Sequence, residues 1–153
     1  MAEIVTHLWY DKEAVEAAEL YISIFPESRI DNIGRIEDTP SGDCDIVEFT
    51  LAGRRYIALS AGPMFRFNEA VSLLVPCETQ YEIDYYWERL SANPSEGQCG
   101  WTKDRFGLSW QVWPTILRQM LSSHDKGAKA RLLQVVRQSK RFILADLVKA
   151  FEG

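Results

Sequence analysis

Short segments of alternating hydrophobic and polar residues are separated by segments with a helical spacing. A period of two is typical of strands with one buried face. It predicts strands at 4–10, 29–37, 47–51, 56–61, 71–75, 98–102 and 108–113. Apolar residues three and four positions apart predict helices at about 12–25, 80–90, 116–122, 127–138 and 143–151. The mixture predicts an α+β fold.

Four polar residues are expected to fix local structure. Asp11 stands where it could cap the first helix, and Thr79 with Glu82 has the spacing of a capping box before the second. Asp104 lies in the expected turn between the last two strands, where an aspartate normally accepts hydrogen bonds from its own backbone.

The order strand, helix, strands occurs twice. We expect a single domain over residues 1–153, with module one at about 3–66 and module two at about 67–114. Helices at about 115–153 would form a C-terminal extension. Two βαβββ modules, each with an apolar face on its helix, would form a cupped mixed sheet around a shared space.

Composition narrows the possible partners. A net charge of -5 over 153 residues argues against general nucleic-acid binding, which needs a basic footprint. We expect no membrane partner, because no apolar run reaches the length of a membrane span and the start does not read as a signal peptide. Three cysteines without metal or redox spacing are typical of reduced thiols in a cytoplasm. A basic run at 126–141 could contact an anion or form a solvated helix face.

The segment 99–114 concentrates the candidate chemistry. Leu108, Trp110 and Val112 would share one strand face, and Ser109, Gln111 and Trp113 the other. Such a strand suits a ligand cavity wall and also an ordinary sheet. Cys99, which follows Gly97-Gln98 and precedes Gly100, could be a nucleophile if a base or positive field lowered its pKa, or a small packed thiol.

Three segments, 8–28, 61–70 and 99–114, together resemble PhnB-like proteins. This family, many of whose members carry the label 3-demethylubiquinone-9 3-methyltransferase, is placed in the glyoxalase/bleomycin-resistance/dioxygenase (vicinal-oxygen-chelate) superfamily. The resemblance extends over essentially the whole chain, the C-terminal helices included. It implies paired βαβββ modules around a small-molecule pocket, and a homodimer.

The resemblance also implies where a divalent metal would bind. Active superfamily members ligate one with His, Glu or Gln side chains from inner strands, which here points to His7, Glu69 and Gln111. Gln111 stands where active relatives often carry glutamate, and a neutral amide is a weak ligand. The alternative is that His7 is a satisfied strand residue, Gln111 a hydrogen-bonded wall residue, and no metal binds.

Glu69, Gln111 and Cys99 are therefore the candidate catalytic residues. The candidate pocket residues are aromatic or amide side chains, namely Trp9, Phe67, Asn68, Trp101 and Trp110. Aromatic surface beside a few polar groups suits a small ligand. The same aromatic residues could instead form core or dimer contacts, and the 68–69 segment a hinge between modules.

Three functions follow from the resemblance. The first is a lyase, isomerase or dioxygenase-type enzyme acting on a small oxygenated substrate. The second is a non-catalytic binding protein without metal, like bleomycin-resistance proteins. The third is the methyltransferase of the family label, against which stands the absence of a glycine-rich turn after the first strand, since no glycine precedes Gly34.

Overall fold

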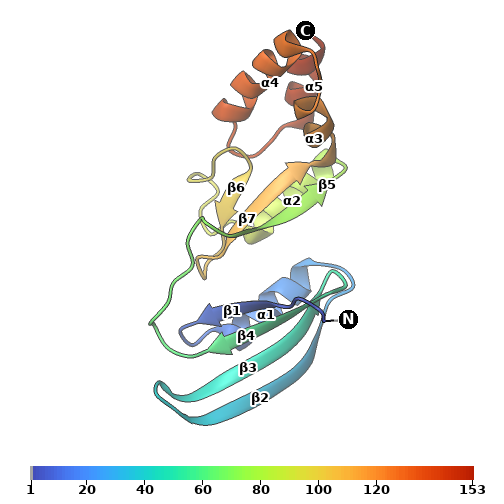
Figure 1. The fold of residues 1–153 in the computed structure, drawn as a ribbon. Coiled ribbons are helices and arrows are strands. Elements are labelled where there is room, and N and C mark those ends of the chain that lie inside the picture. The colour runs from blue at the N-terminus through green and yellow to red at the C-terminus, as the bar shows by residue number, and fades with distance from the viewer. Residues whose placement is uncertain (1) are drawn as a thin grey trace. The chain divides into compact units, whose positions relative to one another are not determined.

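The computed structural model describes residues 2–153 and confirms the α+β class (Figure 1). The chain divides into two compact units, Met1–Phe67 and Asn68–Gly153, called the first and second unit below. Each unit contains one mixed sheet packed on a helix.

The first unit forms a four-stranded sheet. Its elements are β1 (Thr6–Tyr10), α1 (Ala14–Ile24), β2 (Arg29–Thr39), β3 (Gly42–Leu51) and β4 (Arg54–Ser60). The strand order is β1-β4-β3-β2, with β1 parallel to β4 and the other pairs antiparallel. Helix α1 packs on β3 and β4 through small and aromatic buried residues, namely Ala14, Ala17, Ala18, Tyr21 and Ile24.

The prediction that Asp11 caps helix α1 is wrong. The N-cap residue is Glu13 rather than Asp11, and Glu13 makes no side-chain capping bond. The helix begins at Ala14, too far along the chain for Asp11 to serve. The Oγ of Ser60, at the end of β4, accepts from the Ala14 amide at 3.0 Å instead. A cap supplied by a neighbouring strand leaves no local sequence signal.

The second unit, like the first, opens with a strand followed by a helix. It contains β5 (Ser72–Cys77), α2 (Gln80–Leu90), β6 (Trp101–Lys103) and β7 (Ser109–Pro114), in the order β5-β7-β6. β5 is parallel to β7, and β6 is antiparallel to it. The capping box is confirmed, since Thr79 Oγ1 accepts from the Glu82 amide and Glu82 Oε2 from the Thr79 amide.

The second unit has one strand fewer than the expected βαβββ. By position, β5, β7 and β6 correspond to β1, β4 and β3, and nothing in the described chain corresponds to β2. Residues 91–100 form a loop there, with a single bridge between Gln98 and Trp101. Cys99 and Gly100 have φ of 53° and 79°, a left-handed conformation that interrupts an extended strand.

Three helices follow β7, close to the expected ranges. They are α3 (Thr115–Leu121), α4 (Lys126–Gln138) and α5 (Leu144–Glu152). Their shared core is fully apolar and consists of Leu117, Met120, Leu132, Phe142 and Leu147. None of the helices in residues 2–153 combines the length and hydropathy needed to cross a bilayer.

Candidate functional site

A cavity of about 790 Å³ lies in the second unit beside β6. Its wall is formed by the 92–99 loop, by β6 and by single residues before β5 and at the start of β7. The lining residues are Glu69, Ala92, Asn93, Glu96, Gly97, Gln98, Cys99, Trp101, Thr102, Lys103 and Ser109. This size is within the range of small-molecule sites.

The loop is tied to the free edge of β6. The Ala92 amide donates to Lys103 O at 2.8 Å, and Gln98 and Trp101 exchange backbone bonds of 3.1 and 2.9 Å. Gly97 lies against the Trp87 ring, where an added Cβ would come within 2.3 Å of it. Only glycine fits at this position. Gly97 therefore allows the loop to pack directly against helix α2.

An ion pair lies at the edge of the cavity. Lys103 Nζ is 2.5 Å from Glu69 Oε1, and both side chains remain well exposed. The hydrogen bond from Lys103, with a smaller contribution from the backbone, lowers the pKa of Glu69 below its usual 4.5. The carboxylate is thus ionised at neutral pH, and the exposed pair contributes little stability.

Ser109 adds an unused polar group. Its side chain is buried, and within residues 2–153 its Oγ has no hydrogen-bond partner. In the sheet register Ser109 is paired with Lys103 on β6 and with Ser72 on β5, so these three residues share one face. A buried hydroxyl without a partner is costly, and a ligand oxygen or a water that reached it would reduce that cost.

Cys99 is the only half-buried cysteine among the three, since Cys44 and Cys77 are buried. Burial, together with the nearby Glu82 and Glu78 carboxylates, raises the pKa of Cys77 to about 12. Cys77 is therefore a packed thiol. Cys99 lines the cavity and is the thiol that a reagent can reach most readily.

The structure brings three of the predicted residues together at one cavity, namely Glu69, Cys99 and Trp101. Gln111 and Trp110 are not among its lining residues. Gln111 Nε2 donates to Ser72 Oγ at 2.7 Å, and the buried Trp110 indole donates to Asp104 Oδ2 at 2.8 Å. Asn68 is exposed, and its side chain accepts from the Ala70 amide at 2.9 Å.

The other predicted residues belong to the first unit. His7 is exposed on β1, on the face opposite to the buried Leu8 and Tyr10. Trp9 Nε1 donates to Gly62 O at 2.8 Å, and the Phe67 ring lies 5.1 Å from that of Tyr10. Within residues 2–153, no three His, Cys, Asp or Glu side chains form a metal-binding group.

Sequence reasoning missed Ser109, Lys103 and the 92–98 loop as parts of a site. Ser109 did carry a signal, because it alternates with Trp110 and lies on the polar face of its strand. Lys103 lies just outside the strand expected at 98–102, whereas in the structure it is the last residue of β6. Residues 93–97 read as a loop from their sequence, but the strand expected at 98–102 begins only at Trp101, so the loop is longer than expected and its contribution to a cavity carried no local signal.

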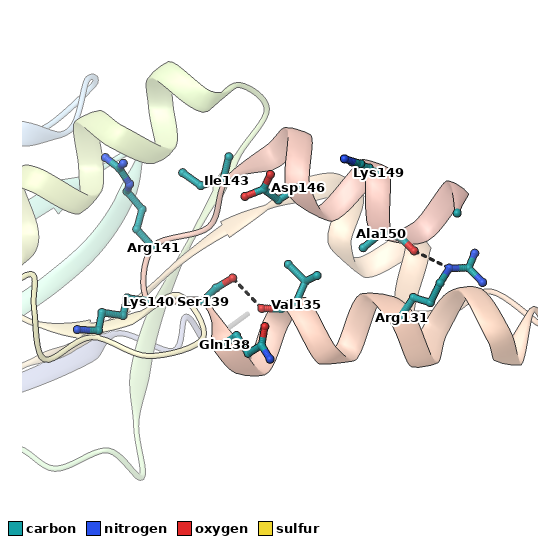
Figure 2. Close-up of a pocket in the computed structure, with 11 residues that line it drawn as sticks. Arg131, Val135, Gln138, Ser139, Lys140, Arg141, Ile143, Asp146, Lys149 and Ala150 are labelled. Atoms are coloured by element: carbon teal, nitrogen blue, oxygen red, sulfur yellow. Dashed lines mark hydrogen bonds between the residues drawn. The ribbon is translucent and has the colours of Figure 1, made fainter.

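A second hollow of about 680 Å³ lies among residues of α4, α5 and the segment between them (Figure 2). Four cationic residues line it, namely Arg131, Lys140, Arg141 and Lys149. Arg131 donates to the carbonyl oxygens of Ala150 and Phe151 at 2.9 Å each, and Arg141 lies 3.0 Å from Asp84. Two of the four cations thus stabilise the helices themselves.

Two mixed sheets, each packed on one helix, and a small-molecule-sized cavity in the second unit define a PhnB-like α+β protein. The family model described as 3-demethylubiquinone-9 3-methyltransferase matches residues 2–113, most of the chain. The protein therefore belongs to this family of PhnB-like proteins. No curated protein is significantly similar to the sequence.

Solved structures agree with this assignment. A PhnB protein from Bacillus cereus, provisionally described as a 3-demethylubiquinone-9 3-methyltransferase, is 29% identical with a TM-score of 0.62, covering 74% of this chain and 100% of its own. A Pseudomonas aeruginosa protein is 17% identical with a TM-score of 0.59, covering 74% of this chain and 98% of its own, and supports the fold alone.

The matched region is shorter than expected. The resemblance was expected to include the C-terminal helices, but the family model ends at residue 113, one residue before β7 ends. Helices α3 to α5 therefore lie outside it. The Bacillus cereus protein, matched over its full length, likewise covers only 74% of this chain.

Proposed function

We propose that the protein binds a small oxygen-bearing molecule in the cavity beside β6. The observation that carries this proposal is the convergence of Glu69, Cys99 and Trp101 on one cavity. Glu69 precedes β5, whereas Cys99 and Trp101 lie together about 30 residues later, so two separate stretches of the chain meet at this cavity. The cavity combines aromatic surface with a few polar groups, as ligand sites generally do.

The polar groups favour a ligand with an anionic oxygen, such as a small carboxylic acid. Lys103 supplies a positive charge and Ser109 an unpaired hydroxyl, on the same sheet face. Lys103 is paired with Glu69, but the pair is exposed, so a ligand carboxylate could replace Glu69 at little cost. Trp101 would contact the apolar part of the ligand.

If the protein is an enzyme, we propose lyase, isomerase or dioxygenase-type chemistry in this cavity, with Glu69 as a lining carboxylate and Cys99 as the lining thiol. Non-catalytic binding is the alternative, and it requires only the cavity. The metal site of His7, Glu69 and Gln111 stays a prediction, which metal analysis of the purified protein can test. The expected cytoplasmic homodimer also stays a prediction.

The family name keeps methyl transfer as a further possibility. Calorimetry with S-adenosylmethionine tests it directly, because a methyltransferase must bind its methyl donor. No heat of binding at millimolar donor would exclude this function.

Calorimetric titration with small mono- and dicarboxylic acids and their neutral amides tests the main proposal. We expect at least one acid to bind, its amide to bind at least 10-fold more weakly, and Lys103→Met to weaken the acid by a similar factor. Lys12→Met, an exposed lysine of the first unit, is the matched control and should leave affinity unchanged. Binding of acids that Lys103→Met leaves unaltered, or binding by no member of the panel, would contradict the proposal.

A further inference from the structure

The segment between α4 and α5 runs along the cavity loop (Figure 1). The Cys99 amide donates to Ser139 O at 2.7 Å, and the Gly100 amide donates to Lys140 O at 2.8 Å. On the opposite side, the Val112 amide of β7 donates to Gly100 O at 2.8 Å. The loop is thus hydrogen-bonded to the sheet on one side and to the C-terminal extension on the other.

Phe142 fixes this contact by packing. Its side chain is fully buried, and an added Cβ on Gly100 would lie 2.5 Å from its ring. The ring also meets Trp113 edge-on, with centroids 6.2 Å apart. Gly100 has a φ of 79°, so both its conformation and its contact with the ring require glycine.

Helix α2 holds the same segment from its first turns. Gln80 Nε2 donates to Phe142 O at 3.1 Å, and Gln80 Oε1 accepts from the Leu144 amide at 2.7 Å. Asp84 pairs with Arg141 at 3.0 Å. Figure 2 shows Ser139, Lys140 and Arg141 on this stretch between the two helices. The segment is therefore anchored to helix α2 at several points.

We propose that residues 139–142, which we name the C-terminal clasp, hold residues 97–100 of the loop in the shape that forms the cavity. Phe142 is the main positioning residue. The clasp lies outside the residues that the family model matches, so it is an addition of this chain to the matched region. Its effect on the loop is independent of any ligand. Its effect on ligand affinity rests on the proposed function.

The test compares two variants of the full chain that remove buried side chains from the same core, Phe142→Ala and Leu132→Ala. Leu132 lies within α4 rather than in the clasp, so it controls for general loss of packing. Hydrogen exchange of the Cys99 and Gly100 amides and the rate of Cys99 labelling by a thiol reagent report on the loop. Acid affinity, measured as above, reports on the cavity.

We expect Phe142→Ala to accelerate both loop readouts at least 10-fold, Leu132→Ala to change them less than 3-fold, and Phe142→Leu to restore most of the protection. Gln80→Leu, which removes two anchoring bonds without opening the core, should accelerate them in the same direction if Phe142→Ala does not fold. Equal acceleration by Phe142→Ala and Leu132→Ala, or none in either Phe142→Ala or Gln80→Leu, would overturn the clasp. Faster loop exchange with unaltered acid affinity would support the clasp and count against the cavity as the acid site.

Discussion

The two sheets differ at one edge, and the candidate site lies at that edge. In the first unit, β2 pairs with β3 over most of its length and completes a four-stranded sheet. In the second unit, β6 has only three residues, and the 91–100 loop lies where β2 would be expected. A paired strand covers its neighbour's backbone and leaves no room, whereas a loop held at a few points leaves a cavity beside the strand.

The difference also shows how the backbone beside an unpaired sheet edge finds hydrogen-bond partners. Backbone amides of the loop donate to Lys103 of β6 at one end and to Ser139 and Lys140 of the C-terminal extension at the other. The C-terminal extension thus satisfies backbone amides of the loop that takes the place of a fourth strand. A site can be added to a repeated module by removing a strand, provided that another segment satisfies the backbone.

The largest expected effect concerns the turn that joins the last two strands of the second sheet, β6 and β7. Asp104 accepts from the Phe106 and Leu108 amides and from the Trp110 indole, at 2.9, 3.1 and 2.8 Å. Asp104→Ala removes this buried acceptor and should lower the free energy of unfolding by about 3 kcal/mol. Urea unfolding followed by tryptophan fluorescence would measure it, because four of the five tryptophans lie in the second unit.

Asp43→Ala is the control for that measurement. Asp43 is exposed in the first unit and pairs with Arg35 at 3.3 Å, so its removal should cost at most about 1 kcal/mol. A loss below about 1 kcal/mol for Asp104→Ala would mean that the turn in the second unit does not depend on this carboxylate.

An intermediate effect is expected at the helix starts. Thr79→Ala removes half of the capping box of α2 and should cost about 1 kcal/mol. Glu13→Ala, at the N-cap of α1, should cost less than about 0.5 kcal/mol, because Glu13 makes no capping bond. The same urea experiment, with circular dichroism to include α1, checks both. Equal losses at the two positions would show that the box contributes nothing specific.

The smallest effect is expected at the turn between β3 and β4. Ala52 and Gly53 both have positive φ, 47° and 75°, as a type I′ turn requires, and alanine is strained there. Ala52→Asn should raise the free energy of unfolding by about 0.5 kcal/mol, because asparagine tolerates this conformation. Differential scanning calorimetry should show a small rise in Tm, roughly 1–2 °C for a chain of this size. A lower Tm would contradict the turn assignment.

Local signals predicted most of the fold. Strand alternation located β7, and the spacing of Thr79 and Glu82 fixed the start of α2. The turn role of Asp104 is also confirmed by its backbone bonds. These features depend on neighbours within a few residues, so the sequence pattern contains them.

Long-range features were the ones missed. Ser60 caps α1 from 46 positions away, and Ser139 meets Cys99 across 40 positions, so no local spacing reveals either. The candidate site was half predicted for the same reason. Residue chemistry pointed to Glu69, Cys99 and Trp101. The role of Ser109 depends on its hydroxyl lacking a hydrogen-bond partner among the described residues, which only the folded structure shows.

The clasp has a consequence for the order in which the two units can form during synthesis. The first sheet has all its strands once Ser60 has left the ribosome. The second unit must wait for Phe142, which follows Gly100 by about 40 residues, or roughly 2–8 s of translation. During that interval the loop, the cavity beside it and the Cys99 thiol all lack the contacts that residues 139–142 provide. A nascent chain should therefore expose Cys99 to labelling long after its first unit has become resistant to protease.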